Sequence, residues 1–248
     1  MVNRAALKKI AKALEIKKGE TVIEIGAGNG TLTLEILKIA DKVIAIEKDP
    51  AWIRQLESKI KNQKSKVKII EGDVREVLPE IAKKLKNYKV VGNIPYYLTG
   101  QLLRIFQQLK NPPKLIVLTI QKEVAQRITA RPAKANQLAA IVNLWAKPKI
   151  LFHLKPKDFY PPPKVHSSVI KLEILPEGQR LKNEESVISL IKTAFQQPRK
   201  TLLNNLSRKF PKNIVQKAFK QLNFNEKTRP QELEHELWIK LAKILPCF

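Results

Sequence analysis

The sequence predicts an α/β domain built on a parallel sheet, followed by a small all-helical domain. Short β-branched segments alternate with helical patterns through the first half of the chain, which is typical of parallel strands joined by helices. These strand segments are apolar almost throughout, as expected for a sheet that helices cover on both faces. After a turn-rich linker, Pro176–Arg180, only helical patterns follow. We therefore expect one domain at 1–178 and a second at 179–248.

The expected elements follow in chain order. After a basic amphipathic helix in "MVNRAALKKIAKAL", the first five strands are expected at Thr21–Gly26, Lys42–Glu47, Lys66–Asp73, Tyr88–Asn93 and Lys114–Gln121. The helices between them are expected at Leu32–Ile39, Ala51–Lys61, Val77–Lys86 and Thr99–Gln108. Two helices, 122–128 and 136–146, and two strands, 148–154 and 166–175, complete the first domain. The helices of the second domain are expected at Glu184–Phe195, Arg199–Phe210, Ile214–Leu222 and Pro230–Leu245.

The composition indicates a polyanionic partner. The 248 residues include 47 Lys and Arg against 22 Asp and Glu, a formal net charge of +25. A net charge above about 8 exceeds what solubility needs, so nucleic acid is favoured over a membrane surface, with a purely solubilising charge as the alternative. The N-terminus has no signal-peptide pattern, and no apolar run reaches the roughly 18 residues of a membrane span. We expect a cytoplasmic protein with no membrane contact.

Metal and disulfide chemistry are not expected. The single cysteine, Cys247, excludes a disulfide framework and a cysteine-based metal site. The three histidines, His153, His166 and His235, are scattered without metal-ligand spacing, so we interpret them as structural or surface residues.

A glycine array follows the first expected strand. In "EIGAGNG", Gly26, Gly28 and Gly30 let the backbone turn tightly and approach a ligand at a helix N-terminus. The dinucleotide-binding pattern G-x-G-x-x-G does not fit, because Thr31 occupies the position of its third glycine. Glu24 precedes the array and would repel a pyrophosphate, but it suits a ligand that carries an ammonium group.

Acidic residues mark the ends of successive strands. Glu47 ends the second strand, at the place where a carboxylate grips ribose hydroxyls, and Asp73 ends the third. Each acid alone is better explained as a helix cap or a solvated strand end. Together with Glu24 and the glycine array, they favour a cationic nucleoside, and S-adenosylmethionine fits that description.

The stretch "VVGNIPYYLTG", Val90–Gly100, ends the fourth strand. Its simplest interpretation is a turn with some aromatic packing. Beside a methyl donor, Asn93 offers an amide oxygen for an exocyclic amine, Pro95 fixes the backbone, and Tyr96 offers a ring for a base that has left its stack. Such a site works by positioning rather than by a strong base. We expect Tyr97 to serve in packing.

Several segments carry a family resemblance. "EIGAGNGTLT", "AIEKD", "EGDV", "VVGNIPYYLTG", "QKEVAQRI" and "FYPPPKVHSSVI" together resemble the bacterial small-subunit rRNA adenine dimethyltransferases, from Val2 to about Leu206. The resemblance implies a Rossmann-like class I S-adenosylmethionine-dependent methyltransferase sheet. It implies that the cofactor is bound by Glu24, Gly26, Gly28, Glu47, Lys48, Asp73, Val74 and Asn93, with Asp73 facing its adenine. It also implies that Asn93, Pro95 and Tyr96 present the target base and that Phe159 closes over the base's other face, although Phe159–Pro163 also fits a stiff exposed loop.

The sequence departs from the family at two points and leaves two alternatives open. The Tyr-Gly pair that the family usually has before its "RLS"-like helix is absent, and "KANQLA" stands there. No Gln-x-Phe-Leu segment, which folds over the cofactor in the family, is recognised near Met1–Arg4, so we expect altered cofactor affinity rather than an altered fold. Macrolide-resistance methyltransferases of large-subunit rRNA share the Asn-Ile-Pro-Tyr stretch, but "QKEVAQR" and the triple proline favour the small-subunit enzymes. A non-catalytic RNA-binding assembly factor is the other alternative.

Two acid-free tracts predict where RNA binds. Val124–Lys157 and Ser186–Asn225 contain Lys and Arg but no Asp or Glu, and RNA is recognised largely through shape and phosphates. Some of these lysines fit a solvated helix face equally well. The expected RNA contacts are Arg127, Arg131, Lys164, Arg199, Lys200 and Arg208. The family resemblance further implies an enzyme that dimethylates two adjacent adenines near the 3′ end of small-subunit rRNA within the immature small ribosomal subunit, and we expect it to be a monomer.

Overall fold

The computed structural model describes residues 1–179 and 184–246. Arg180 of the expected linker and Cys247 lie outside the described residues. The chain divides into two compact units, one formed by Met1–Ala125 and Lys147–Ile174, the other by Gln126–Ala146 and the chain from Leu175 onward. The second unit therefore includes a segment from within the predicted first domain, and the predicted division at 178 remains a prediction. Among the described residues, no helix has the length and apolar character needed to span a bilayer.

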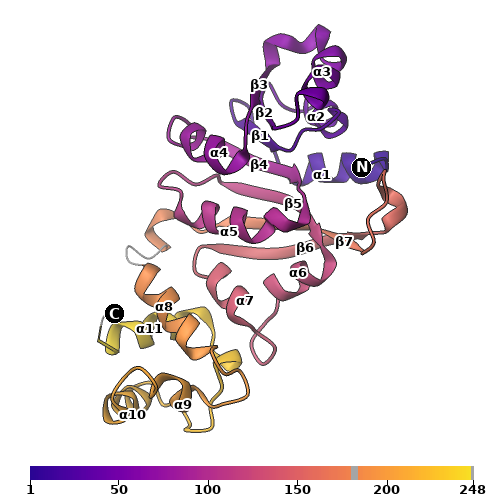
Figure 1. The fold of residues 1–248 in the computed structure, drawn as a ribbon. Helices are drawn as coiled ribbons and strands as arrows, with labels where there is room; N and C mark the ends of the chain where they lie inside the picture. Colours follow the sequence, from indigo (N-terminus) through magenta and orange to yellow (C-terminus); the bar gives the residue numbers. More distant parts are fainter. Residues whose placement is uncertain (180–183, 247–248) are drawn as a thin grey trace. The chain divides into compact units, whose positions relative to one another are not determined.

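The first unit is built on a twisted seven-stranded sheet (Figure 1). Its strands follow the order β3-β2-β1-β4-β5-β7-β6, and their bounds are β1 Thr21–Ile25, β2 Lys42–Glu47, β3 Val67–Glu71, β4 Tyr88–Asn93, β5 Leu115–Gln121, β6 Ala146–Leu154 and β7 Ser167–Ile174. The five strands from β3 to β5 run parallel, whereas β7 pairs antiparallel with β5. The predicted strands are confirmed, and the reversal of β7 is an addition that the sequence pattern did not contain.

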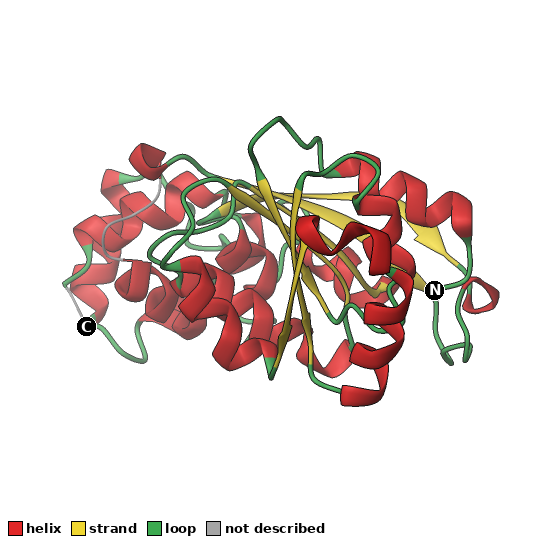
Figure 2. Cartoon of the chain, turned by 90° about the horizontal axis from the view of Figure 1, so that it is seen from above, coloured by secondary structure: helices red, strands yellow, loops and turns green. Residues whose placement is uncertain are grey.

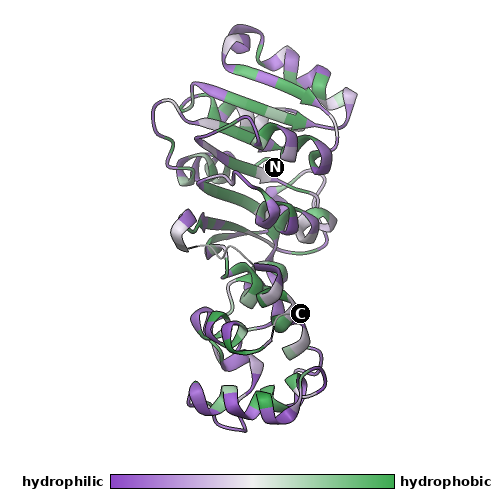
Figure 3. Cartoon of the chain, turned by 90° about the vertical axis from the view of Figure 1, so that its left-hand side faces the viewer, coloured by the Kyte–Doolittle hydropathy of each residue, from purple (hydrophilic) through white to green (hydrophobic). Residues whose placement is uncertain are grey.

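Helices cover both faces of this sheet (Figure 2). They are α1 Arg4–Ala13, α2 Thr31–Ile36, α3 Pro50–Lys59, α4 Val74–Ala82 and α5 Thr99–Gln108, and α6 Lys122–Ile128 spans the division between the units. Every residue of β1 is buried, which explains why its sequence is apolar rather than alternating. The hydropathy colouring shows the same pattern, with largely green strands between helices that carry purple segments (Figure 3).

The N-terminal helix α1 packs into the core of the first unit. Asn3 caps it by accepting a hydrogen bond from the Ala6 amide at 3.0 Å. Leu7 and Ile10 are buried on its apolar face. The basic amphipathic pattern therefore reflects one buried and one solvated face.

The second unit is helical among its described residues. Its helices are α7 Gln137–Val142, α8 Glu184–Ala194, α9 Leu202–Leu206, α10 Lys212–Gln221 and α11 His235–Ile244. Three helix predictions were too long. The helix predicted at 136–146 ends at Val142, and Ala146 already begins β6. The helix predicted from Arg199 begins only at Leu202, because Thr201 is its N-cap and accepts a hydrogen bond from the Asn204 amide at 3.3 Å. The segment predicted as one helix from Pro230 forms a short 3₁₀ turn and then α11.

Candidate active site

A cavity of about 150 Å³ lies beside the carboxyl ends of β1 and β4. The strand order reverses between these two strands, and ligands of open α/β sheets bind at such a switch point. Its lining includes Glu24, Gly26 and Gly28 from the β1 side and Asn93 from β4. The structure therefore brings together half of the predicted cofactor residues and the predicted acceptor amide.

The glycine array has the backbone geometry that requires glycine. Gly26 and Gly28 have φ of 67° and 53°, in the left-handed region that L side chains rarely adopt. Gly92, just before Asn93, is needed for another reason. A Cβ there would lie 2.9 Å from the Ile25 carbonyl oxygen on β1, so the two strands could not stay this close. Gly92 therefore allows β1 and β4, which form the two sides of the cavity, to lie close together.

Glu47 is fixed by backbone amides. One carboxylate oxygen accepts from the Gly28 amide at 2.7 Å, and the other accepts from the amides of Lys48 at 2.8 Å and Asp49 at 3.0 Å. Glu47 thus ties the glycine loop to the end of β2 while remaining partly exposed. Carboxylate oxygens have further lone pairs, so the group can still accept from a ribose diol.

Glu24 lies on β1, two residues before Gly26, and is buried, with 1% of its surface exposed. Burial raises the pKa of Glu24 to about 8. The Thr33 hydroxyl, which donates a hydrogen bond to the Glu24 carboxylate at 2.5 Å, opposes this rise in pKa, and the negative charge of nearby Glu47 adds to the rise. Glu24 is therefore largely neutral at pH 7 in the free protein. A cationic ligand in the cavity would favour its ionised form, which agrees with the predicted role beside an ammonium or sulfonium group.

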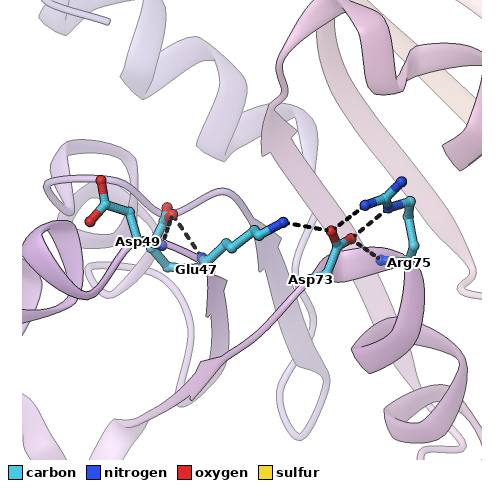
Figure 4. A network of polar contacts seen from close by, with 5 residues as sticks. Glu47, Asp49, Asp73 and Arg75 are labelled. Carbon is cyan, nitrogen blue, oxygen red and sulfur yellow. Dashed lines mark hydrogen bonds and ion pairs between the residues drawn. The ribbon is translucent and has the colours of Figure 1, made fainter.

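Asp73 lies in a cationic contact that the sequence did not indicate (Figure 4). Arg75 donates to both of its oxygens, at 2.9 and 2.6 Å, and the Lys48 ammonium lies 3.3 Å away. The Arg75 guanidinium holds the pKa of Asp73 well below its usual range. Asp73 also caps α4 through the Arg75 amide, and Val74 begins that helix and is buried. Asp73, Lys48 and Val74 do not line the enclosed cavity, so their contact with the cofactor's adenine remains a prediction.

The segment after β4 presents one anchored ring and one exposed ring. The Tyr96 hydroxyl hydrogen-bonds the buried Ser167 hydroxyl of β7 at 2.7 Å, which fixes the ring's position. Pro95 is exposed. Tyr97 is 79% exposed, so the expectation that it serves in packing is wrong. The Tyr97 side chain is exposed to solvent, whereas Ile94 and Leu98 supply the buried contacts of this segment.

The segment from Asp158 to Tyr160 is fastened to the N-terminus. Asp158 accepts from the Asn3 side chain at 2.8 Å, and its carbonyl accepts from the Val2 amide at 2.9 Å. Phe159 is partly buried against the core, whereas Tyr160 is 83% exposed and lines the cavity. The role of Phe159 over the target base remains a prediction. Tyr160 was missed, and its only signal was its place in "FYPPPKV".

The predicted RNA contacts are all exposed. Lys164 belongs to the first unit, and the second contains Arg127, Arg131, Arg199, Lys200 and Arg208. Exposure permits contact with RNA without proving it, so these residues stay predictions.

The chain matches a family model over nearly its whole length. The model, described as ribosomal RNA adenine dimethylase, covers residues 1–246. The chain belongs to the ribosomal RNA adenine dimethylase family. It is 36% identical over 247 residues to the ribosomal RNA small subunit methyltransferase A of Caldanaerobacter subterraneus subsp. tengcongensis, covering 96% of this chain and 91% of that protein. The protein of the same name from Alkaliphilus metalliredigens is 37% identical over 253 residues, covering 98% of this chain and 88% of that protein.

Solved structures agree with this membership. A dimethyladenosine transferase from Plasmodium falciparum superposes with a TM-score of 0.86 at 26% identity, covering 96% of this chain and 94% of that one. The 23S rRNA methyltransferase ErmE superposes with a TM-score of 0.80 at 22% identity over 98% of both chains, and this likeness shows the fold alone. The predicted Rossmann-like methyltransferase sheet with C-terminal helices is confirmed.

Members of the family are S-adenosylmethionine-dependent methyltransferases, so S-adenosylmethionine is the cofactor. The residues fit it in part. An enclosed volume of about 150 Å³ is smaller than the roughly 300–1,000 Å³ of sites that enclose a whole ligand, so the cavity suits one end of S-adenosylmethionine.

Trp52, 42% exposed, also lines this cavity. The sequence reasoning missed it because it lies on α3 outside any motif.

Proposed function

We propose that this enzyme transfers methyl groups to the exocyclic amines of two adjacent adenines near the 3′ end of small-subunit rRNA, within the immature small ribosomal subunit. The observation that carries the proposal is the placement of Asn93, at the carboxyl end of β4, in the wall of the cavity that the glycine array of β1 also lines. A methyl donor in that cavity would lie beside the amide that receives the amine.

The residues act by positioning. S-adenosylmethionine supplies the electrophilic methyl group when bound. The Asn93 side-chain oxygen accepts a hydrogen bond from the adenine amine and so directs the lone pair of the amine nitrogen toward the cavity. Tyr96, anchored through Ser167, offers a fixed ring face to the extruded base. The rate enhancement then comes from orientation and from exclusion of water rather than from a general base.

The two alternatives receive less support. A non-catalytic assembly factor has no need for an acceptor amide beside a donor cavity, and family membership supports the enzyme. A large-subunit specificity of the macrolide-resistance type is opposed by the relatives at 36% and 37% identity, which are named for the small subunit.

The proposal is tested by methyl transfer. Purified protein, labelled S-adenosylmethionine and immature small subunits should give labelled adenines, located by mapping the modified bases. Large subunits serve as the control substrate and should remain unlabelled. Label confined to large subunits would overturn the small-subunit assignment. Label on neither particle, with the cofactor bound, would favour the non-catalytic factor.

A cytoplasmic location and a monomeric state belong to the same proposal. Ribosomal subunits mature in the cytoplasm of bacteria, which supports the location. One copy of the chain carries both the donor cavity and the acceptor residues, which supports the monomer. Sedimentation of the purified protein tests the monomer, and a dimer at micromolar concentration would contradict it.

A further inference from the structure

The second unit contains a larger cavity that the methyl-transfer reaction does not use. Its volume is about 430 Å³, within the range of roughly 300–1,000 Å³ that holds small ligands. Arg127 lines it from the last turn of α6 and Lys134 from the loop before α7. Phe195 and Pro198 line it from the segment after α8, and Gln231 lines it from the turn before α11. Residues from both acid-free tracts thus meet around one cavity.

One wall of this cavity is held by specific backbone contacts. Ala133 has φ of 72°, a left-handed conformation that residues other than glycine rarely adopt. Its amide donates to the Gln231 carbonyl at 2.9 Å, which holds the loop in this conformation. Asn136 caps α7 and also donates from its side chain to the Arg127 carbonyl at 2.8 Å. The wall is therefore formed before any ligand arrives.

The opposite wall is held by one buried amide. Asn205 is fully buried, its side-chain nitrogen donates to the carbonyls of Gln197 at 3.0 Å and Thr201 at 3.1 Å, and its oxygen accepts from the Gln197 amide at 3.0 Å. These bonds fix the turn that contains Pro198 and the predicted RNA contacts Arg199 and Lys200.

The lining has the chemistry of a nucleotide site. No acidic side chain lines the cavity, and neither Arg127 nor Lys134 forms an ion pair within the described part of the chain. Two uncompensated cations favour a phosphate. The Phe195 ring is backed by the Trp238 ring, with centroids 5.9 Å apart, which keeps an aromatic surface in place. The Gln231 side-chain oxygen is buried and has no hydrogen-bond partner among the described residues, so a small rotation of this side chain gives a base amine an acceptor.

We propose that this cavity binds one unstacked nucleotide of the RNA substrate, with its phosphate at Arg127 and Lys134 and its base at Phe195 and Gln231. The inference rests on the proposed function only in taking RNA as the ligand. Proteins recognise RNA sequence mainly through unpaired nucleotides whose bases stack on aromatic rings. A free phosphate would use the cations alone, and the test below separates the two sources.

The test measures binding of a labelled single-stranded hexaribonucleotide to the full chain by fluorescence anisotropy. Saturating S-adenosylmethionine keeps the cavity of the first unit occupied. Lys134→Ala should weaken binding about threefold or more, and should reduce the slope of log affinity against log salt by about 0.7, the value for one phosphate contact on a single strand. Gln231→Leu should weaken binding to a similar extent but leave the slope unchanged, because no charge is lost.

A matched control separates this site from diffuse charge. Lys243 on α11 is exposed and lies outside both acid-free tracts and the cavity, so Lys243→Ala should bind as the unaltered protein does. Equal losses in Lys243→Ala and Lys134→Ala would overturn the proposal, as would unaltered binding by Lys134→Ala and Gln231→Leu. Unchanged melting temperatures verify that the variants fold.

Competition distinguishes a nucleotide from a phosphate. Cytidine monophosphate, whose exocyclic amine can donate to the Gln231 side-chain oxygen, should displace the hexanucleotide at a lower concentration than inorganic phosphate does, and equal displacement would overturn the base contact. Methyl transfer is measured separately. If binding depends on Lys134 and Gln231 but the protein methylates no small-subunit adenine, the nucleotide site is supported and the proposed function is refuted. If the protein methylates these adenines but both variants bind RNA normally, the proposed function is supported and the nucleotide site is refuted.

Discussion

The two cavities described above differ in the charge of their linings. The cavity of the first unit is lined by one acidic side chain, Glu24, which is largely neutral in the free protein, and by no Lys or Arg, although the chain carries a net charge of +25. The cavity of the second unit is lined by Arg127 and Lys134 and by no acid. A cation-free lining whose acid can ionise suits a cationic methyl donor, and a cationic lining suits a polyanion. The surplus of positive charge therefore says little about the catalytic centre and much about the second unit.

Salt should separate the two cavities most clearly. If the six predicted RNA contacts each neutralise a phosphate, raising salt from 50 to 200 mM should weaken binding of the RNA substrate about a thousandfold. Binding of S-adenosylmethionine should change by less than about threefold, because its contacts are few and partly buried. Filter binding and calorimetry over the same salt series make the comparison. Equal salt dependence of both ligands would contradict the division of charge.

Asn93→Ala should cost the next largest amount. Losing one positioned polar group at the reacting centre lowers kcat by about 100- to 1,000-fold in other enzymes, and a similar loss of methyl transfer is expected here. Binding of RNA should change little, because Asn93 contributes one uncharged contact and the variant keeps all six predicted phosphate contacts. Single-turnover methylation measures the loss, and calorimetry should show that the cofactor still binds. A variant with full activity on immature subunits would refute the acceptor role.

Glu47→Ala should weaken cofactor binding by about 10- to 100-fold, the effect of about 1.5–3 kcal/mol for hydrogen bonds to a charged group. The variant would lose the proposed ribose contact, and it also releases the Gly28 amide. Glu71→Ala is the matched control, because Glu71 is the residue paired with Glu47 on β3 and is exposed. Calorimetry with S-adenosylmethionine checks both variants, and equal affinity in Glu47→Ala and the unaltered protein would refute the contact.

Glu24→Gln should produce the smallest change, visible as a pH dependence. Because burial raises the Glu24 pKa from 4.5 to about 8, the folded protein binds more protons than the unfolded chain between these values. Its contribution to stability is therefore full below pH 4.5 and falls as the pH rises toward 8. Glu24→Gln should remove this decline while keeping an acceptor for the Thr33 hydroxyl.

Melting temperatures at pH 5 and pH 8 measure the Glu24 effect. The control is Glu57→Gln, which changes an exposed carboxylate on α3 and should decline with pH as the unaltered protein does. The same decline in Glu24→Gln would show that Glu24 ionises normally and that the first cavity holds a charged acid.

Much of the fold and part of the site could be predicted from the sequence. The strand β4 and the helix α5 were predicted at their observed bounds, because the apolar run ends at Asn93 and an amphipathic pattern starts at Thr99. The glycine array could be placed because only glycine adopts its backbone angles cheaply. Trp52 and Tyr160 could not, since a single aromatic residue outside a known pattern is more often a packing residue.

By itself the sequence determined the alternation of strands and helices, the acidic strand ends and the acceptor stretch from Asn93 to Tyr96, because each depends on residues close together in the chain. The tertiary structure alone decided the neutral state of Glu24, the contact of Lys48 with Asp73, and the cavity of the second unit. These depend on burial and on contacts between segments far apart in sequence, such as the bond from Ala133 to Gln231. A local sequence pattern does not specify which distant side chains bury the Glu24 carboxyl or complete the wall of the second unit's cavity.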